Sequence, residues 1–279
     1  MKNKSLTLTL VIPVYNEEDH IKECLEAVAC QTVMPDEVLV IDNNCTDKTI
    51  TIARQFTFVR IIHEKTQGLI AARNHGFDEA KGDILGRIDA DSRIQKDWVA
   101  RVKHDFNVPL DGVTGLAIAD TLPLKGNFQT VFWSHFYFWW REATFGHFIL
   151  WGANMAISRE AWQKIKNKVC LDDSKVHEDQ DISSLIVRYG GRLKCDTKLI
   201  ISTDAHDYNY WPKFYEYSQR ARKTKQMHYQ DLHSKNAQSI RLNLLQRGWR
   251  MLLIIVPYSI FIGVSLLLYS FQLLKGKRR

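Results

Sequence analysis

The first hundred residues alternate between two hydrophobic periodicities, and this alternation restricts the fold more than any other feature of the sequence. Short apolar runs typical of buried strands cover 6–14, 37–42, 58–63 and 83–88. Segments with helical spacing separate them, at 17–31, 46–56 and 68–82. Strands joined by helices of this length predict an α/β fold with a doubly wound, mostly parallel sheet and helices on both faces. The carboxyl ends of the strands are then expected along one edge, where ligands bind.

Elements further along the chain are less regular. Apolar runs predict strands at 112–119, 153–158 and 192–196, and helical spacing predicts helices at 178–190 and 212–230. The stretch 128–151 is rich in Phe, Trp and Tyr. Two interpretations of it stay open: a core helix packed on the sheet, or an interfacial element whose aromatic side chains enter lipid headgroups.

A charge-free apolar run covers residues 251–274. As a helix, its roughly 24 residues would extend about 36 Å, enough to span a bilayer with some tilt. The run is therefore predicted to be a C-terminal membrane helix, with a re-entrant path bent at Pro257 and Gly263, or a buried core helix, as alternatives. The predicted domains are an α/β domain over 1–235 and a basic juxtamembrane segment with the membrane helix over 236–279.

Basic residues gather around this apolar run. The formal net charge is +7, and Lys and Arg residues crowd both sides of the run. This distribution favours a membrane surface, and no nucleic-acid partner is expected. The apolar part of the N-terminal segment alternates as a strand does, unlike a secretory signal peptide. A membrane-associated protein whose α/β domain is cytoplasmic is expected.

Acidic side chains follow the predicted strands, and the pair Asp89 and Asp91 is the most informative. Side chains two residues apart on an extended backbone point to the same side, so these carboxylates repel each other unless solvent or a cation separates them. Carboxylate oxygens suit Mg²⁺ or Mn²⁺, with water and substrate phosphate oxygens completing the coordination shell. The alternative is an ordinary solvated turn.

Glycine-rich phosphate loops are absent from the sequence, which contains neither GxGxxG nor GxxxxGK followed by Ser or Thr. Glu17, Glu18 and Asp19 follow the first predicted strand instead, and their charges would repel a triphosphate. These features argue against a P-loop enzyme and against a sugar-phosphate nucleotidyltransferase.

Five motifs follow one another across roughly residues 6–206. They are LVIPVYNEEDHIKECLEAVACQT, EVLVIDNNCTDKT, GLIAARNHGFDEAKGDILGRIDADS, WGANMAISREAW and HEDQDISSLIVRYGG. Together they resemble the family 2 glycosyltransferases, which have the GT-A fold. The resemblance implies a nucleotide-sugar-binding domain and an inverting transfer of a hexosyl or related sugar from a nucleotide diphosphate sugar to a hydroxyl.

The resemblance also implies which residues contact the donor. Those expected to line the nucleotide sugar are Pro13, Tyr15, Glu17, Asp42, Asn43, Arg73, Asp89, Gly152, Ala153 and Asn154. Three alternatives stay open. Asp42 would be a helix cap, Arg73 a surface arginine on a helix, and residues 152–154 a packing element.

Metal and phosphate contacts follow from the same resemblance. Asp91 is the expected metal ligand, Asp89 meets the ribose or the metal, and His206 is a third metal or phosphate contact or a structural histidine. Arg220 and Arg222 stabilise the leaving diphosphate or face lipid headgroups. The Q-x-x-R-W motif of processive members is only echoed here, without its tryptophan, which argues against polymerisation.

The motif HEDQD carries the implied chemistry. Asp179 resembles the general base, which removes the proton of the acceptor hydroxyl as its oxygen attacks the anomeric carbon. Glu178 would orient the acceptor or the base. For Asp181, a helix-start acid favoured by the helix dipole is preferred over a catalytic role.

The function expected from the sequence is a metal-dependent, membrane-associated glycosyltransferase that uses Mg²⁺ or Mn²⁺. Its acceptor would be lipid-linked or a glycan, held near the membrane by the C-terminal helix. One alternative is a catalytically inactive, membrane-tethered protein that binds nucleotide sugars. A sugar-phosphate nucleotidyltransferase is the other.

Overall fold

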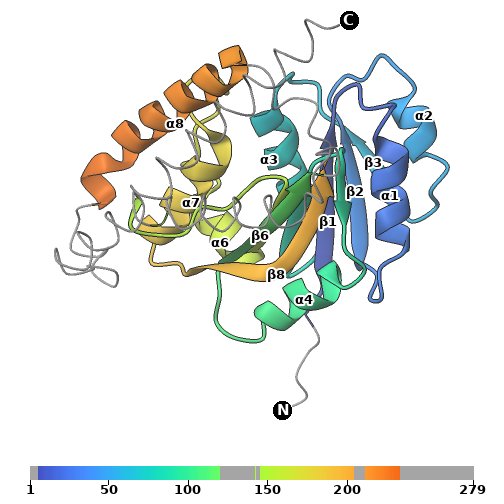
Figure 1. Cartoon of the computed structure of the whole chain (residues 1–279), viewed down its shortest axis with the longest axis horizontal. Coiled ribbons are helices and arrows are strands. Elements are labelled where there is room, and N and C mark those ends of the chain that lie inside the picture. The colour runs from blue at the N-terminus through green and yellow to red at the C-terminus, as the bar shows by residue number, and fades with distance from the viewer. Residues whose placement is uncertain (1–5, 120–141, 143–144, 204–210, 233–279) are drawn as a thin grey trace, which may run out of the picture. The chain divides into compact units, whose positions relative to one another are not determined.

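The computed structural model describes residues 6–119, 142, 145–203 and 211–232 (Figure 1). An eight-stranded sheet with the order β3-β2-β1-β4-β7-β6-β8-β5 runs through this part of the chain. Its strands are β1 Leu8–Val14, β2 Glu37–Asp42, β3 Val59–His63, β4 Ile84–Ile88, β5 Ser92–Ile94, β6 Gly112–Ala119, β7 Asn154–Ser158 and β8 Leu193–Thr203. The described helices are α1 Ile21–Ala29, α2 Thr49–Ala53, α3 Leu69–Glu79, α4 Trp98–Asp105, α6 Arg159–Ile165, α7 Glu178–Arg188 and α8 Trp211–Leu232.

Strands β1 to β4 form the parallel part that the sequence predicts. β1 lies between β2 and β4 and is parallel to both, and β2 is parallel to β3. Every residue of β1 is buried, as expected for a strand covered on both faces. Pro13 lies beyond the last residue of β1 that pairs with β4, so its missing N–H leaves no gap in that ladder.

Helices cover both faces of the sheet, and each face has its own core. On one face, Leu8, Leu10 and Ile12 pack with buried residues of α1 and α4. On the other, Val11 and Ile41 pack with buried residues of α3, α6 and α7. The alternation along β1 follows the two-residue period of a strand and confirms the predicted layers.

The direction of β7 differs from what the sequence suggested. β7 is antiparallel to both β4 and β6, and the short β5 is antiparallel to β8. The carboxyl ends therefore do not all share one edge, because β7 begins where β4 ends, with Asn154 paired to Ile88. This reversal brings the residues just before β7 to the edge where Asp89 and Asp91 follow β4.

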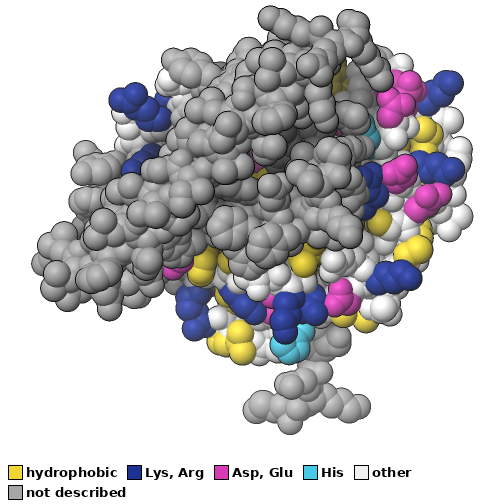
Figure 2. Space-filling view, in the orientation of Figure 1, with side chains coloured by type: hydrophobic (Ala, Val, Ile, Leu, Met, Phe, Trp, Pro, Cys, Tyr) yellow, Lys and Arg dark blue, Asp and Glu magenta, His cyan; other side chains and the backbone are white. Residues whose placement is uncertain are grey.

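Several elements differ from the predicted ones in extent. β8 continues to Thr203, seven residues beyond the predicted strand 192–196. β5, α4 and α6 have no predicted counterpart; β5 has 3 residues and is too short to show a period. On the described part of the face in Figure 2, Lys and Arg side chains are interspersed with Asp and Glu side chains.

Within the described ranges, no helix is both long and apolar enough to cross a membrane. The predicted membrane helix at 251–274 and the segment 236–279 that contains it lie outside the described residues. The same holds for most of the aromatic stretch 128–151 and for His206.

A buried hydrogen bond between Trp98 and Asn154 gives a stability prediction. Trp98 Nε1 donates to Asn154 Oδ1 at 2.7 Å, and both residues are fully buried. The substitution Trp98→Phe leaves that oxygen without a donor, and we expect it to lower the free energy of unfolding by about 1–3 kcal/mol beyond the loss from the smaller ring.

Trp162→Phe is the matched control, to be compared with Trp98→Phe by urea denaturation. Trp162 is also buried, but its Nε1 donates to Asp78, whose side chain is 47% exposed and can bind water instead. Trp162→Phe should therefore cost less. Equal losses for the two variants would contradict the assignment of a structural hydrogen bond to Asn154.

Candidate active site

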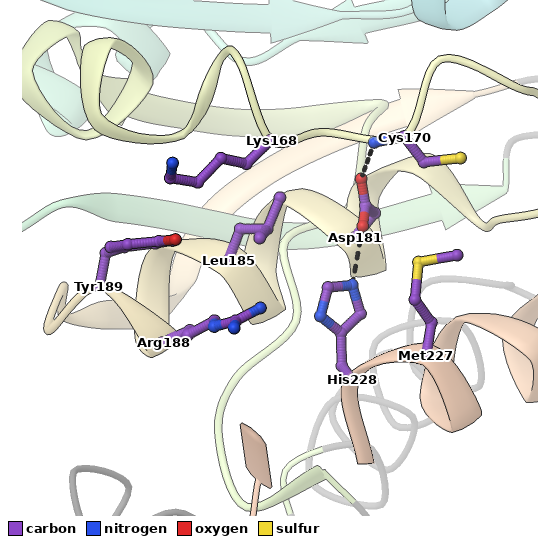
Figure 3. A pocket seen from close by; sticks show the side chains of 8 residues that line it. All are labelled: Lys168, Cys170, Asp181, Leu185, Arg188, Tyr189, Met227 and His228. Carbon is purple, nitrogen blue, oxygen red and sulfur yellow. Dashed lines mark hydrogen bonds and ion pairs between the residues drawn. The ribbon is translucent and has the colours of Figure 1, made fainter. Parts of the chain in front are cut away.

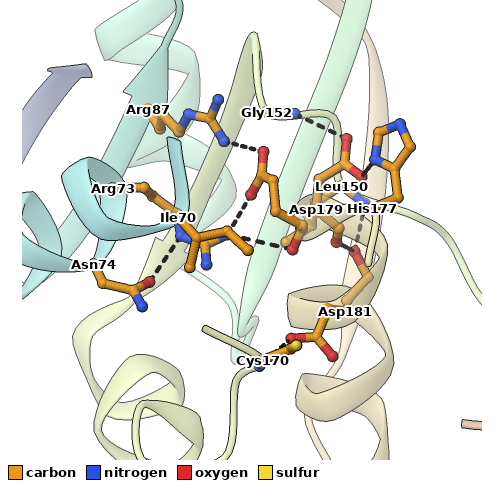
Figure 4. Close-up of polar contacts among 12 residues, drawn as sticks. Ile70, Arg73, Asn74, Arg87, Leu150, Gly152, Cys170, His177, Asp179 and Asp181 are labelled. Atoms are coloured by element: carbon orange, nitrogen blue, oxygen red, sulfur yellow. Dashed lines mark hydrogen bonds and ion pairs between the residues drawn. The ribbon is translucent and has the colours of Figure 1, made fainter. Parts of the chain in front are cut away.

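A buried cluster of one glutamate and two arginines lies between the sheet and α7 (Figure 4). Glu178, the first residue of α7, pairs through one carboxylate oxygen with Arg73 of α3 and through the other with Arg87 of β4. Both arginines are buried, with at most 1% exposure. Arg73 also reaches the Glu178 carbonyl at 3.3 Å and the Asn74 side chain at 3.0 Å. Arg73 is therefore not a surface arginine, and its contacts fix the start of α7.

Arg87 links this cluster to Asp89. Its Nη2 lies 2.8 Å from Asp89 Oδ1, as expected for side chains two residues apart on one side of the chain. Burial lowers the pKa of Arg87, but Glu178 and Asp89 raise it by more, so the guanidinium stays charged. Arg87 is not among the site residues predicted from the sequence. An arginine inside an apolar strand, two residues before an aspartate, was the available signal.

Gly152 leaves room for the cluster. A Cβ atom at this position would lie 2.5 Å from Arg87 Nη1 and 2.8 Å from Glu178 Oε1. Any larger residue here would displace these two side chains, which fits the packing alternative. Ala153 and Asn154 are buried too, and the Asn154 amide donates to the carbonyls of Leu116 and Leu199, each at 3.0 Å.

Asp179 is held from two sides. Its Oδ1 lies 2.6 Å from His177 Nδ1, and its Oδ2 accepts a long hydrogen bond of 3.4 Å from the Gly152 N–H. The Asp179 carbonyl accepts from the Ser183 hydroxyl at 2.5 Å, and that hydroxyl accepts from the Leu150 N–H at 2.9 Å. The carboxylate thus has a fixed orientation beside the strand end that carries Asp89.

Three carboxylates face one region at the ends of β1 and β4. Burial raises the pKa of Glu17, His20 lowers it, and Asp91 and Asp89 raise it further, with a net upward shift. Burial also raises the pKa of Asp89; Arg87 lowers it and Asp91 raises it, again with a net upward shift. Mutual repulsion of this kind is relieved by a bound cation.

The donor set around Asp91 suits a hard divalent cation. Asp91 Oδ2 accepts from the Thr203 hydroxyl at 3.0 Å, and its Oδ1 lies 3.5 Å from the Ser92 hydroxyl. Asp89 Oδ1 accepts a hydrogen bond from Arg87, which leaves Asp89 Oδ2 to bind a cation. The described ranges contain no group of three His, Cys, Asp or Glu side chains that could hold an ion. Two carboxylates would therefore need water and ligand oxygens to complete the shell.

The loops after β1 and β2 are locked together. Asn16 and Asn44 both have positive φ, 55° and 68°, which asparagine tolerates better than most residues. Asn16 Oδ1 accepts from the Thr46 N–H at 2.8 Å. Tyr15, the residue after β1, is 52% exposed, so its ring is accessible to a ligand.

Asp42 and Asn43 organise these loops. Asp42 Oδ1 accepts from the Cys45 N–H at 2.9 Å and closes a turn, but Asp42 does not cap α2, whose N-cap residue is Lys48. Asn43 is buried; its amide donates to the Thr66 carbonyl at 2.7 Å, and its oxygen accepts from the Gly68 N–H at 2.8 Å. Asn43 thus holds the segment that leads into α3.

Arg220 and Arg222 lie on α8, which packs against α7. Arg222 is exposed and Arg220 is half-buried. A pocket of about 460 Å³ between α7 and α8 is lined by Lys168, Cys170, Asp181, Leu185, Arg188, Tyr189, Met227 and His228 (Figure 3). Asp179 is not among the lining residues, because it is about 200° from Asp181 around the helix.

Residues 9–166, more than half of the chain, match the model of glycosyl transferase family 2. The chain belongs to this family. This confirms the resemblance on which the expected site residues rest.

Curated relatives match over about 100 residues. Glycosyltransferase AglE of Haloferax volcanii is 41% identical over 101 residues, covering 34% of this chain and 33% of AglE. The putative glycosyltransferase EpsH of Bacillus subtilis is 33% identical over 95 residues, covering 33% of this chain and 28% of EpsH. The matched region thus spans about a third of each relative's length.

Solved structures share the fold at low sequence identity. The mannosyltransferase PcManGT from Pyrobaculum calidifontis, in complex with GDP-Man and Mn²⁺, has a TM-score of 0.65 and 19% identity, covering 95% of this chain and 81% of PcManGT. S. aureus TarS 1-349 in complex with UDP-GlcNAc has a TM-score of 0.59 and 16% identity, covering 87% of this chain and 69% of that one. The GT-A-like α/β fold is therefore confirmed.

The cluster of Arg73, Glu178 and Arg87 gives the second prediction. Glu178→Gln removes the charge shared by two buried arginines, and we expect it to lower the free energy of unfolding by about 3 kcal/mol or more. Urea denaturation measures this loss.

Glu26→Gln is the control, because Glu26 makes an exposed pair with Lys22 at 3.8 Å on one face of α1. It should change the free energy of unfolding by less than about 0.5 kcal/mol. A loss from Glu178→Gln as small as that of the control would show that the buried cluster does not stabilise the fold.

Proposed function

We propose that this chain is a metal-dependent, inverting glycosyltransferase that moves a sugar from a nucleotide diphosphate sugar to an acceptor hydroxyl. One observation carries the proposal: Arg87 and Glu178 tie the strand end that carries Asp89 and Asp91 to the helix start that carries Asp179. A site for a diphosphate and a proton acceptor are thereby held side by side. Family membership and neighbours in complex with GDP-Man or UDP-GlcNAc support this class of donor.

Asp91, with Asp89, would hold Mg²⁺ or Mn²⁺ against the diphosphate. When bound, the cation supplies charge neutralisation for the leaving group. Tyr15, Glu17 and Asp42 lie at the ends of β1 and β2, on the side expected for the base and ribose. The complex of PcManGT with GDP-Man and Mn²⁺ supports a divalent cation. Arg220 or Arg222 would add positive charge near the departing diphosphate.

Asp179 is the proposed general base. It accepts the proton of the acceptor hydroxyl while that oxygen attacks the anomeric carbon, and the sugar–phosphate bond breaks with its electron pair on the diphosphate. His177 and the Gly152 N–H orient the carboxylate. Both oxygens of Glu178 bind buried arginines, so Glu178 acts as a positioning residue for Asp179.

The proposed acceptor is lipid-linked or a glycan at the cytoplasmic face of a membrane. The charge-free run at 251–274 and the basic residues around it support this setting. If the protein had lost catalysis, it would bind a nucleotide sugar without turnover. A nucleotidyltransferase would instead release pyrophosphate.

The donor class gives the third prediction. We expect one of UDP, GDP, CDP and dTDP to stabilise the full chain in detergent in the presence of Mn²⁺ but not with EDTA. Saturation at 100 times the dissociation constant stabilises by about 2.7 kcal/mol, which a thermal-shift assay detects. Asp91→Asn should remove the metal-dependent shift, and Asp97→Asn, an exposed aspartate paired with Arg101, should keep it.

Asp179→Asn separates binding from turnover. We expect this variant to keep the nucleotide shift and to lose about 10²–10⁴-fold of the rate at which nucleoside diphosphate is released from the matching donor. Full activity of Asp179→Asn would refute its role as the base. No metal-dependent shift with any of the four nucleotides would refute the donor class.

A further inference from the structure

We propose that α8 positions the general base, through Thr224 and His228 acting on the first turn of α7. This inference rests on the proposed function, because it takes Asp179 as the base. The two residues are four apart and share one face of α8. Their partners on the other helix, His177 and Asp181, are also four apart and flank Asp179 in sequence.

The first contact joins Thr224 to the backbone of His177. The Thr224 hydroxyl accepts the His177 N–H at 2.7 Å and donates to the Arg220 carbonyl at 2.8 Å, and Thr224 is fully buried. The bond to Arg220 fixes the hydroxyl hydrogen, so a lone pair faces His177. Since the His177 ring lies 2.6 Å from Asp179 Oδ1, a shift of the His177 backbone would move a contact of the base.

The second contact is a buried hydrogen bond between His228 of α8 and Asp181 of α7 (Figure 3). His228 Nε2 lies 2.7 Å from Asp181 Oδ1, and the two side chains are 5% and 2% exposed. Asp181 Oδ2 accepts the Cys170 N–H at 2.9 Å. The expected role of Asp181 as a helix-start acid is thus incomplete, because its carboxylate binds groups from two other segments of the chain.

Polar contacts fix the position of α7 relative to α8 more closely than apolar packing would. Apolar packing would hold α8 against α7 but would allow it to slide, whereas hydrogen bonds fix distance and direction. Asp181 and Asp179 face different sides of α7, so α8 binds one side of the turn while the base faces Gly152 on another. A displacement of about 1 Å at a reacting group can cost 10²-fold in rate. Thr224 and His228 therefore influence turnover without touching the donor.

The test compares Thr224→Val with Thr224→Ser in the full chain. Valine has nearly the same shape but no acceptor for the His177 N–H, whereas serine keeps one. We expect Thr224→Val to lower kcat for nucleoside diphosphate release from the donor, with water as acceptor, by about tenfold to a hundredfold. The affinity for the nucleotide with Mn²⁺ should not change, and Thr224→Ser should restore the rate.

Rates are divided by the number of nucleotide-binding sites, so that loss of folded protein does not count as loss of kcat. His228→Leu should act as Thr224→Val does, and His228→Gln, which keeps a donor for Asp181, should retain most of the rate. Gln226→Ala, at an exposed position of α8, should leave the rate unchanged.

Amide hydrogen exchange supplies a readout that does not depend on activity. Thr224→Val should speed exchange in residues 177–181 and leave α3 unchanged. Unchanged exchange in 177–181, or an unchanged kcat per site for an active enzyme, would overturn the proposal. If the wild type releases no nucleoside diphosphate, the proposed function fails on its own, and the exchange result still decides whether α8 holds the first turn of α7.

Discussion

The pairing of Glu178 with Arg73 and Arg87 is the interaction on which the rest of the site depends. It joins α3, β4 and α7 at one buried point, and Asp89 supplies the fourth charge, so that two arginines face two carboxylates. Removing Glu178 leaves buried Arg73 without its carboxylate partner and Arg87 with only Asp89, which costs far more than the intact group contributes to stability. Such a cluster is better suited to fixing one arrangement of its parts than to maximising stability.

The side chains of the site fall into two layers around this cluster. Tyr15, Glu17, Asp89 and Asp91 form an open layer, since their side chains are exposed or partly exposed, and they are the residues proposed to meet the cation and the nucleotide. Arg73, Asn43, Asn154 and Gly152 are buried, and their hydrogen bonds or small size hold the open layer in place. Thr224 and His228 extend the buried layer to α8. The proposed sugar transfer needs both layers, because a catalytic carboxylate works only within a narrow range of positions.

Features of the fold and site that depend on neighbouring residues could be predicted from the sequence, whereas features that depend on residues far apart in the chain could not. The parallel strands β1 to β4 were predicted closely, because each is a short apolar run between helices and needs no distant information. The reversed direction of β7 could not be predicted, because an apolar run such as 153–158 indicates a strand but not its direction in the sheet. The function of Arg87 depends on Glu178, 91 residues later, and that of Thr224 on His177, 47 residues earlier. Local sequence patterns show which residue types are present. Contacts between residues far apart in the chain decide which of those side chains bind a ligand and which hold other side chains in position.

The most direct test of the account is the substitution Arg87→Lys. Lysine keeps the buried charge but lacks the guanidinium geometry that reaches Glu178 and Asp89 together. Nucleotide affinity is measured by titration in the presence of Mn²⁺, and turnover is measured per binding site. We expect Arg87→Lys to weaken nucleotide binding about tenfold or more and to slow turnover, because Glu178 and Asp89 lose the guanidinium that binds both. A folded Arg87→Lys variant that binds and turns over like the wild type would contradict the account.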